Sequence, residues 1–257
     1  MARVIQERHG RVMKLINNDP AKRNAFGLDF YDHMIPAIEA AAADDSIGAV
    51  VICGAEGFFC AGGDLNRLAV AHKLEFSERR QGVDKLHVMM RAIRNCPKPV
   101  IAAVEGGAAG AGASFAAMCD LIVAETGSYF MLAYVKIGLT TDGGATWSFT
   151  RNLPRQLASE MGLTGGKISS QRLYDCGMVN RMSDNALDDA MAWAAELANN
   201  SSTAMAGIKR MIVEAEEASL EAHFETEAVG IATAMKSKDG MEGTSAFLEK
   251  RKPKFHD

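Results

Sequence analysis

A run of small residues between positions 99 and 120 has the composition of a site at which a ligand approaches the main chain. Residues 100–104 are apolar and bounded by prolines and glycines, which predicts a short buried strand. Four glycines follow among alanines, and a short apolar helix is expected over residues 113–118. The first amides of a helix lack intrahelical partners, and the helix dipole favours negative charge beside them. The stretch can hold a phosphate or an oxyanion formed during a reaction, although close packing is the simpler interpretation of the small residues alone.

The composition of the chain argues against several classes of function. Its 257 residues are 48% hydrophobic and 23% charged, which is typical of a soluble globular protein. A formal net charge of −4 gives no basic surface for nucleic acid, and no apolar run reaches membrane-spanning length. Five scattered cysteines without a CxxC pair, and no leader at the start, lead us to expect a cytoplasmic protein. The six histidines lack metal-ligand spacing, so we expect no metal site.

The first half of the chain has the pattern of strands joined by helices. A helix followed by a buried strand occurs at 28–53 and again at 84–104, which favours parallel strands with right-handed crossovers. The charged segment 65–82 is either a mobile cover over a pocket or a solvated helix. The expected strands are 4–7 and 12–16, which form a hairpin, then 49–53, 100–104 and 121–124.

Beyond Gly144 the sequence predicts an almost wholly helical chain. Leu153 and Pro154 separate two helices, and amphipathic helices are expected at 187–197, 204–215, 220–235 and 241–249. We therefore expect two parts, an α/β core over residues 1–195 and a helical region over residues 196–257. Long apolar helices of this kind often pack on a neighbouring subunit.

Several motifs in register resemble the crotonase (enoyl-CoA hydratase/isomerase) superfamily. They are Asn18-Asp19-Pro20 with Asn24-Ala25-Phe26, Phe59-Cys60-Ala61-Gly62-Gly63-Asp64-Leu65, residues 104–120 ending in Cys119-Asp120, Leu163-Thr164-Gly165, and Ala246-Phe247-Leu248-Glu249-Lys250-Arg251. The resemblance implies an α/β fold, a ClpP-like spiral of ββα units followed by a C-terminal helical trimerisation region. It also implies an acyl-CoA thioester as ligand, and a homotrimer or dimer of trimers.

In this family two backbone amides form the oxyanion hole, and the matching positions here are Gly63 and Ala111. Both amides would donate to the thioester oxygen as it becomes an enolate, and each such donor is worth roughly 2.7–4 kcal/mol. For Asp64, beside the first of these amides, we expect a structural role as N-cap of the following helix.

Two departures from the family pattern bear on the reaction. Hydratases of the family carry two glutamates, and the matching positions here hold Ser114 and Tyr134. Hydration needs one group to activate water and a source for the proton delivered to carbon. The resemblance therefore disfavours conventional hydratase activity.

One carboxylate remains at a position that the family uses for catalysis. Asp142 matches the site at which epoxide and double-bond isomerases carry an acid, and an aryl-CoA dehalogenase carries a nucleophile. The alternative is that Asp142 caps a helix through Thr146. We expect catalysis, with the pKa of Asp142 raised by an apolar pocket that includes Phe130, Tyr134 and Leu139.

The leading hypothesis is an enzyme that moves an acyl-CoA double bond from Δ3 to Δ2, with Asp142 as the proton carrier. Alternatives are another crotonase reaction (hydration, epoxide isomerisation or thioester and dehalogenase-type chemistry), or a non-catalytic acyl-CoA binder. An RNA-binding member is disfavoured by the acidic balance.

The remaining residues implied by the resemblance would bind the acyl-CoA. We expect Lys22, Arg23 and the tail residues Phe247 and Lys250 near the nucleotide, with the tail reaching a neighbouring subunit; a solvated basic surface is the alternative for the first two. The full set of binding residues is Lys22, Arg23, Ala25, Ala61, Gly62, Gly110, Ser114, Tyr134, Phe247 and Lys250. No cofactor beyond the coenzyme A of the substrate is expected, and the acyl group stays open because segment 65–82 and the pocket walls would select it.

Overall fold

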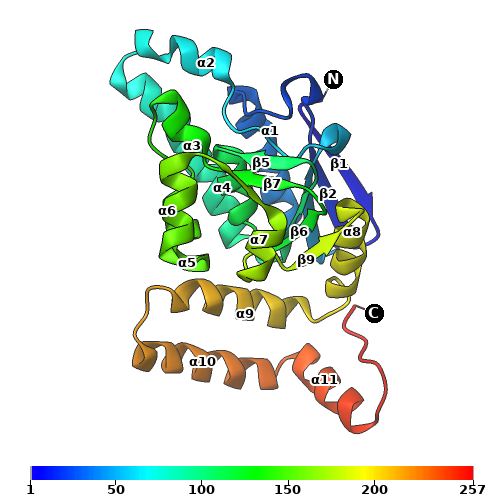
Figure 1. Ribbon diagram of the computed structural model, residues 1–257. Helices are drawn as coiled ribbons and strands as arrows, with labels where there is room; N and C mark the ends of the chain where they lie inside the picture. Colours follow the sequence, from blue (N-terminus) through cyan, green and yellow to red (C-terminus); the bar gives the residue numbers. More distant parts are fainter. Residues whose placement is uncertain (1, 257) are drawn as a thin grey trace.

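The computed structural model describes residues 2–256 and is built around a six-stranded sheet. Along the sheet the strands are β1 (Val4–His9), β2 (Val12–Asn17), β3 (Ala49–Gly54), β4 (Val100–Val104), β6 (Leu121–Glu125) and β9 (Arg181–Ser183). Strand β1 pairs antiparallel with β2, as the predicted hairpin requires, and the other neighbours pair parallel. The expectation of parallel strands is therefore confirmed (Figure 1).

Helices cover both faces of this sheet, which explains why β3 and β4 are continuously apolar and fully buried. Helices α1 (Leu28–Ala43) and α3 (Phe76–Asn95) pack together on one side, and α8 (Ala186–Leu197) lies against the strands on the other. The buried face of α8 consists of alanines, which lets the helix approach the sheet closely.

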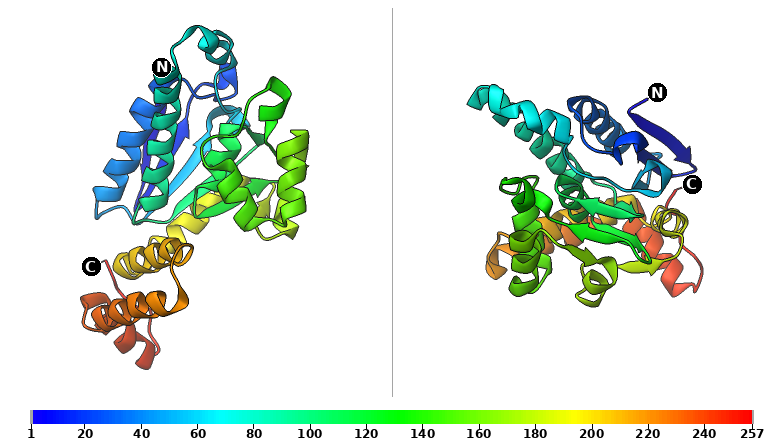
Figure 2. Two further views of the ribbon diagram at one scale, coloured as in Figure 1. Left: turned by 90° about the vertical axis from the view of Figure 1, so that its left-hand side faces the viewer. Right: turned by 45° about the horizontal axis from the view of Figure 1, so that its top comes forward.

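A second sheet, of three short strands, gives the chain its spiral path. It contains β5 (Gly107–Ala109), β7 (Tyr129–Met131) and β8 (Lys167–Ser169). Strand β4 of the large sheet continues into β5 of the small sheet and then into helix α4 (Ala111–Ala117). Strand β6 continues into β7 in the same way, and β3 is followed by an isolated bridge from Cys60 to Ala108. Strands β4 and β6 of the large sheet are thus each followed by a strand of the small sheet before a helix, as the ββα spiral requires (Figure 2).

Segment 65–82 is helical, with α2 (Leu65–Val70) and the first turns of α3. Helix α3 begins at Phe76, earlier than the periodicity indicates, because Glu75 and Glu78 form a capping box at its start. Helix α2 carries apolar side chains that face outward, and Leu65 is 63% exposed. The two alternatives for this segment, a mobile cover over a pocket and a solvated helix, stay predictions.

The prediction of an almost wholly helical chain beyond Gly144 is wrong. Strand β8 lies between α6 (Arg155–Thr164) and α7 (Ser170–Asp175), and β9 precedes α8. Both strands have three residues, which is too short for an alternating pattern to stand out. The break at Leu153 and Pro154 is confirmed, since α5 (Ala145–Asn152) ends there and α6 follows.

The last three helices form a layer beside the core, extending away from the large sheet (Figures 1 and 2). They are α9 (Ser202–Ala215), α10 (Leu220–Met235) and α11 (Lys238–Leu248), and each begins after a serine whose side chain accepts a main-chain N–H. Helix α9 packs on α10, and large side chains such as Phe224 and Ile231 are more than half exposed. The division into parts at residue 195 and the use of these faces by another subunit stay predictions. Within residues 2–256, no helix has the length and apolar character needed to cross a membrane.

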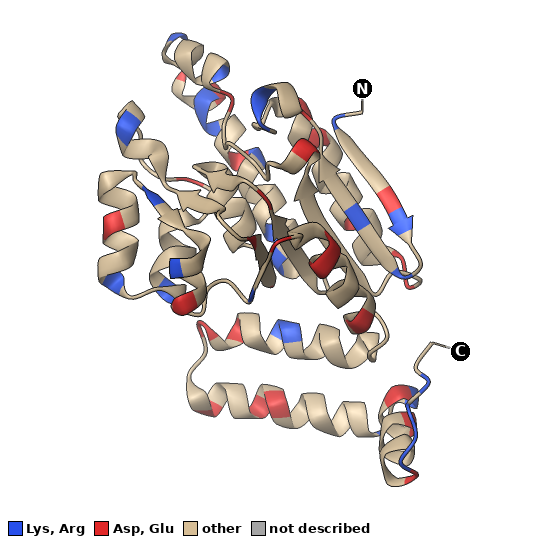
Figure 3. Cartoon of the chain, turned by 45° about the vertical axis from the view of Figure 1, so that its right-hand side comes forward, with Lys and Arg blue, Asp and Glu red and all other residues tan. Residues whose placement is uncertain are grey.

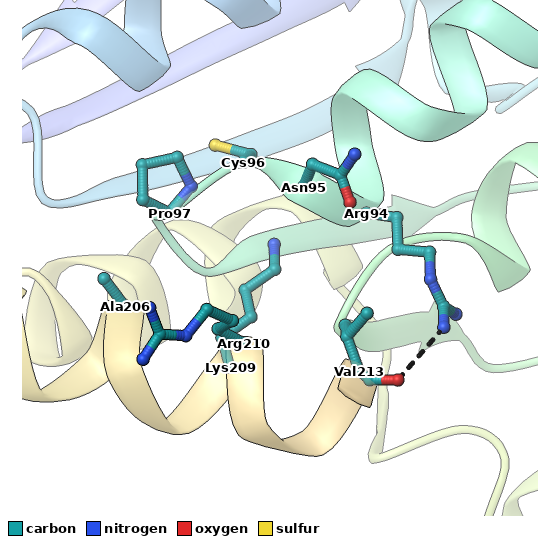
Figure 4. A pocket seen from close by; sticks show the side chains of 8 residues that line it. All are labelled: Arg94, Asn95, Cys96, Pro97, Ala206, Lys209, Arg210 and Val213. Carbon is teal, nitrogen blue, oxygen red and sulfur yellow. Dashed lines mark hydrogen bonds between the residues drawn. The ribbon is translucent and has the colours of Figure 1, made fainter. Parts of the chain in front are cut away.

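Helix α9 is fixed to the core by a charged contact around a pocket of about 290 Å³ (Figure 4). The Lys209 ammonium lies 2.6 Å from Asp120 Oδ2 and also donates to two main-chain carbonyls, those of Ile93 and Lys98. Arg94, at the other end of the pocket, donates to the Val213 carbonyl. Burial raises the pKa of Asp120, while Lys209 opposes that effect.

Candidate active site

In the loop after β3, the main-chain N–H of Gly63 points away from the neighbouring segment, which contains Phe26. Phe26 N donates to Gly62 O over 2.6 Å, and Asp64 N donates to Phe26 O over 3.1 Å. In this parallel bridge the residue between the two partners, Gly63, directs its own N–H to the opposite side. No group within residues 2–256 accepts a hydrogen bond from the Gly63 amide.

A second unpaired amide stands at the start of α4. Ala111 is the first residue of this helix, so its N–H has no intrahelical partner. The preceding Gly110 adopts φ 52° and ψ −127°, a conformation that favours glycine, and it donates to Met131 O. The described part of the chain offers no acceptor to the Ala111 amide.

The two amides lie on adjoining loops. A Cβ added to Gly62, at φ +91°, would stand 2.6 Å from Ala109 O and 3.2 Å from Ala111 N. Glycine at this position therefore permits the close approach of the loop to the start of α4. The arrangement fits an oxyanion hole built from Gly63 and Ala111, and the catalytic role of the two amides stays a prediction.

The predicted role of Asp64 as an N-cap is confirmed, because its carboxylate accepts from Asn66 N over 2.9 Å at the start of α2. The same carboxylate binds Lys22, with Nζ 2.8 Å from Oδ2. That hydrogen bond is the main reason why the pKa of Asp64 lies below its ordinary value. The Arg23 guanidinium lies 5.6 Å from the centre of the Phe58 ring.

Main-chain contacts bring the two predicted binding loops together. Ala61 N donates to Arg23 O, and Ala25 N donates to Lys22 O. Ala25 is buried and Ala61 half-buried, and their role in binding the acyl-CoA stays a prediction.

The Asp142 side chain accepts a hydrogen bond from a tyrosine and does not cap a helix. Tyr134 Oη donates to Asp142 Oδ1 over 2.7 Å, and Ser114 Oγ donates to the Asp142 main-chain carbonyl over 3.2 Å. Ser114 is fully buried and Tyr134 is 9% exposed. Burial raises the pKa of the Asp142 carboxyl, while the hydrogen bond from Tyr134 and the nearby His87 lower it. The alternative that Asp142 caps the next helix is wrong, because the N-cap of α5 is Gly144 and has no side-chain cap.

The surroundings of Asp142 only partly match the expected apolar pocket. Phe130 is fully buried, but Leu139 is 46% exposed. The sequence analysis missed three neighbours, namely His87 on α3, whose charge affects Asp142, and Leu86 and Met90, which contact the adjoining glycine turn. The helical periodicity of α3 predicts that Leu86 and Met90 face the core, but no sequence signal indicates which loop they meet.

The tail residues lie apart from the other predicted binding residues. Phe247 is 83% exposed at the end of α11, and Lys250 follows it with φ +54°. Figure 3 shows Lys and Arg gathered on the segment after α11. This helix belongs to the layer beside the core, away from α2 and the N-terminal hairpin (Figure 1). Within one chain the structure therefore does not bring Phe247 and Lys250 to Lys22 and Arg23.

Comparison with known proteins agrees with this arrangement. The sequence model of the family described as enoyl-CoA hydratase/isomerase matches residues 7–257. The 2,3-dehydroadipyl-CoA hydratase of Escherichia coli (strain K12) is 35% identical over 257 residues, which cover 99% of each chain. The 1,2-epoxyphenylacetyl-CoA isomerase of the same organism is 33% identical over 247 residues, covering 95% of this chain and 94% of that protein.

Among solved structures, an enoyl-CoA hydratase from Polaromonas sp. JS666 is 40% identical and matches with a TM-score of 0.96, over 98% of this chain and 99% of that one. A match of this extent, in sequence and in fold, leaves no large part of the chain outside the comparison. The chain belongs to the enoyl-CoA hydratase/isomerase family of the crotonase superfamily.

Proposed function

We propose that this enzyme moves the double bond of a 3-enoyl-CoA thioester to the 2-position, with Asp142 as the group that carries the proton. The observation that supports this most directly is the buried contact of Asp142 with Tyr134 and Ser114. The latter two residues occupy the positions of the hydratase glutamates in the resemblance. Of these three positions only 142 carries a carboxylate, and isomerisation needs a single carboxylate.

In the proposed reaction Asp142 acts first as a base and then as an acid. The Asp142 carboxylate removes a proton from C2, and the electron pair of that C–H bond forms a dienolate whose negative charge lies on the thioester oxygen. The amides of Gly63 and Ala111 donate to this oxygen, where charge develops. The protonated Asp142 then gives the proton to C4, so that the double bond comes to lie between C2 and C3.

The contacts of Asp142 suit this exchange. Tyr134 binds Oδ1, which leaves Oδ2 outside that hydrogen bond and able to face the substrate. Burial strengthens the carboxylate as a base by raising its pKa towards the operating pH. The hydrogen bond from Tyr134 favours the ionised form and restrains the orientation of the carboxylate.

Isomerisation of a ring epoxide on an acyl-CoA is the second candidate. It is favoured by the 33% identity to a protein named 1,2-epoxyphenylacetyl-CoA isomerase. The same oxyanion amides would serve both reactions, so the two candidates differ in the acyl group that enters the pocket.

We further propose that the enzyme works as a homotrimer or a dimer of trimers, without a cofactor other than the coenzyme A of its substrate. The distance of Phe247 and Lys250 from Lys22 and Arg23 in one chain supports a nucleotide site shared between subunits (Figure 1). The exposed apolar faces of α10 and α11 support an assembly in which another subunit covers them.

The deciding assay is the conversion of 3-hexenoyl-CoA to 2-hexenoyl-CoA, with hydration of the product followed in parallel. Exchange of the C2 protons of hexanoyl-CoA in D₂O tests the base alone. Asp142→Asn is nearly isosteric but accepts no C2 proton, so kcat should fall about 100-fold or more. Ser114→Ala should cost far less, because its hydroxyl only supports the loop of Asp142.

Binding of hexanoyl-CoA to the Asp142→Asn variant is the control for an intact site. Equal turnover by this variant and the parent would refute the role of Asp142. Hydration without isomerisation would refute the reaction, and binding without any turnover would indicate an acyl-CoA binder.

A further inference from the structure

Arg67, on α2, carries a positive charge for which the described residues, 2–256, provide no partner. It is half-buried, yet within residues 2–256 it makes no hydrogen bond, ion pair or aromatic contact. Every other arginine that is not exposed has such a contact: Arg3, Arg11, Arg94 and Arg181. A charge withdrawn from water without a partner costs free energy, so a missing partner is the simplest explanation of this position.

The guanidinium is held in place by the shape of α3. A Cβ added to Gly82 would stand 2.1 Å from Arg67 Nη2 and 3.1 Å from Cζ. The arginine therefore occupies the space that a side chain at position 82 would fill. On the same short helix, Leu68 lies 3.5 Å from where a Cβ of Gly63 would stand, so α2 covers the loop of the first oxyanion amide.

Three acidic side chains of the neighbouring helices are already paired. Asp64 at the start of α2 binds Lys22, Asp32 on α1 binds Lys85, and Asp84 on α3 binds Arg80. None of these three carboxylates forms an ion pair with Arg67 in the described part of the chain.

Tyr31, on α1, presents a second unpaired polar group at the same place. It is 4% exposed, and its hydroxyl has no hydrogen-bond partner in the described part of the chain. Burial raises the pKa of this hydroxyl, the Asp142 carboxylate raises it further, and Arg67 opposes them. Asp32, the next residue of α1, binds Lys85, which lies about one turn after Gly82 on α3, so α1 meets α3 close to the position of Arg67.

We propose that Arg67 and Tyr31 bind a carboxylate at the far end of the acyl group, so that the preferred substrates are CoA thioesters of dicarboxylic acids. The proposal rests on the proposed function only in that the acyl group lies beside Asp142, with its thioester at the oxyanion amides. The carboxylate would take the charge-assisted hydrogen bonds of the guanidinium and the phenol hydroxyl, which the protein leaves unmade.

Binding of saturated thioesters tests this without any turnover. The dissociation constants of adipyl-CoA and suberyl-CoA are compared by calorimetry with those of hexanoyl-CoA and octanoyl-CoA, which have a methyl end instead. The parent should bind the dicarboxylic thioester at least about tenfold more tightly at one of the two lengths. Arg67→Gln should remove this preference while leaving the affinity for the methyl-ended thioester unchanged, and Arg67→Lys should keep part of it.

Two further variants separate recognition from folding. Gly82→Ala should weaken the preference by displacing the guanidinium, although alanine favours the helix. Arg79→Gln, an exposed arginine on α3, should change nothing. The absence of a preference in the parent at both lengths, or an equal loss for both kinds of thioester in Arg67→Gln, would overturn the proposal. A preference that persists in a protein unable to isomerise either 3-hexenoyl-CoA or the CoA thioester of 3-hexenedioic acid would support the carboxylate site while refuting the proposed reaction.

Discussion

Replacing Tyr134 by phenylalanine should shift the pH dependence of the reaction. The hydroxyl donates to Asp142 Oδ1 over 2.7 Å in a setting where Tyr134 is 9% exposed. This bond favours the ionised carboxylate, so its loss raises the pKa of Asp142. A base works in its ionised form, and the acidic limb of kcat/KM must therefore move to higher pH.

The size of the shift follows from the kind of hydrogen bond that is lost. A hydrogen bond to a charged group contributes about 1.5–3 kcal/mol. Since 1.36 kcal/mol corresponds to one pH unit, the limb should move by about one to two units. Well above the limb, Asp142 is ionised in both proteins, and kcat/KM of the variant should come back to within a few-fold of the parent.

The measurement is the pH profile of kcat/KM for 3-hexenoyl-CoA between pH 4 and 9. Tyr174→Phe is the matched control, because Tyr174 is 44% exposed on α7 and should leave the profile unchanged. A Tyr134→Phe profile that falls by the same factor at every pH would show that Tyr134 only shapes the pocket. An acidic limb that stays in place would refute the link between Tyr134 and the charge of Asp142.

Three other perturbations test different parts of the structure. Ala111→Pro removes an oxyanion donor at the first helical position, where proline is tolerated, so kcat should fall about 10²–10³-fold while hexanoyl-CoA still binds; full turnover would refute the oxyanion role. Lys209→Met removes the ammonium from Asp120, which keeps the Val100 N–H as a donor, so denaturant titration should show a loss of about 1.5 kcal/mol in the free energy of unfolding, and an unchanged free energy would contradict this. The shared nucleotide site predicts a trimer or hexamer in sedimentation, with CoA affinity that falls as salt rises and in Lys250→Ala; a monomer with salt-independent binding would refute it.

The parallel sheet was predictable because its strands are continuous apolar runs with breakers at their ends. The stretches around Val50 and Ile101 are buried on both faces, which leaves a strong signal in the sequence. The small sheet was not predictable, since β5, β7 and β8 have three residues each and their pairing depends on partners far away in the chain. The same holds for β9 of the large sheet. Short strands are specified by tertiary contacts, not by their own pattern.

The candidate site was predictable where it consists of main chain. Glycines reveal where the backbone must turn or approach closely; Gly110 adopts a positive φ, and Gly62 combines a positive φ with a close approach. Side chains that come from distant helices were not predictable, because helical periodicity indicates which face is buried but not what it meets. Arg67 illustrates this limit, since its sequence context reads as part of a charged surface, whereas its lack of a partner is visible only in the folded chain.

The two residues that depart from the hydratase pattern, Ser114 and Tyr134, both contact Asp142. A glutamate at position 114 and another at 134 would place two further carboxylates beside Asp142, where like charges raise pKa values and oppose ionisation. Serine and tyrosine at these positions are hydrogen-bond donors, and both donate to Asp142, one to its main-chain carbonyl and one to its carboxylate. The two residues that stand in place of the hydratase glutamates are therefore the same two that donate hydrogen bonds to Asp142. This is consistent with the proposed isomerisation, in which one carboxylate carries a proton between two carbons, because the two positions that could supply a second acid to hold water carry Ser114 and Tyr134 instead.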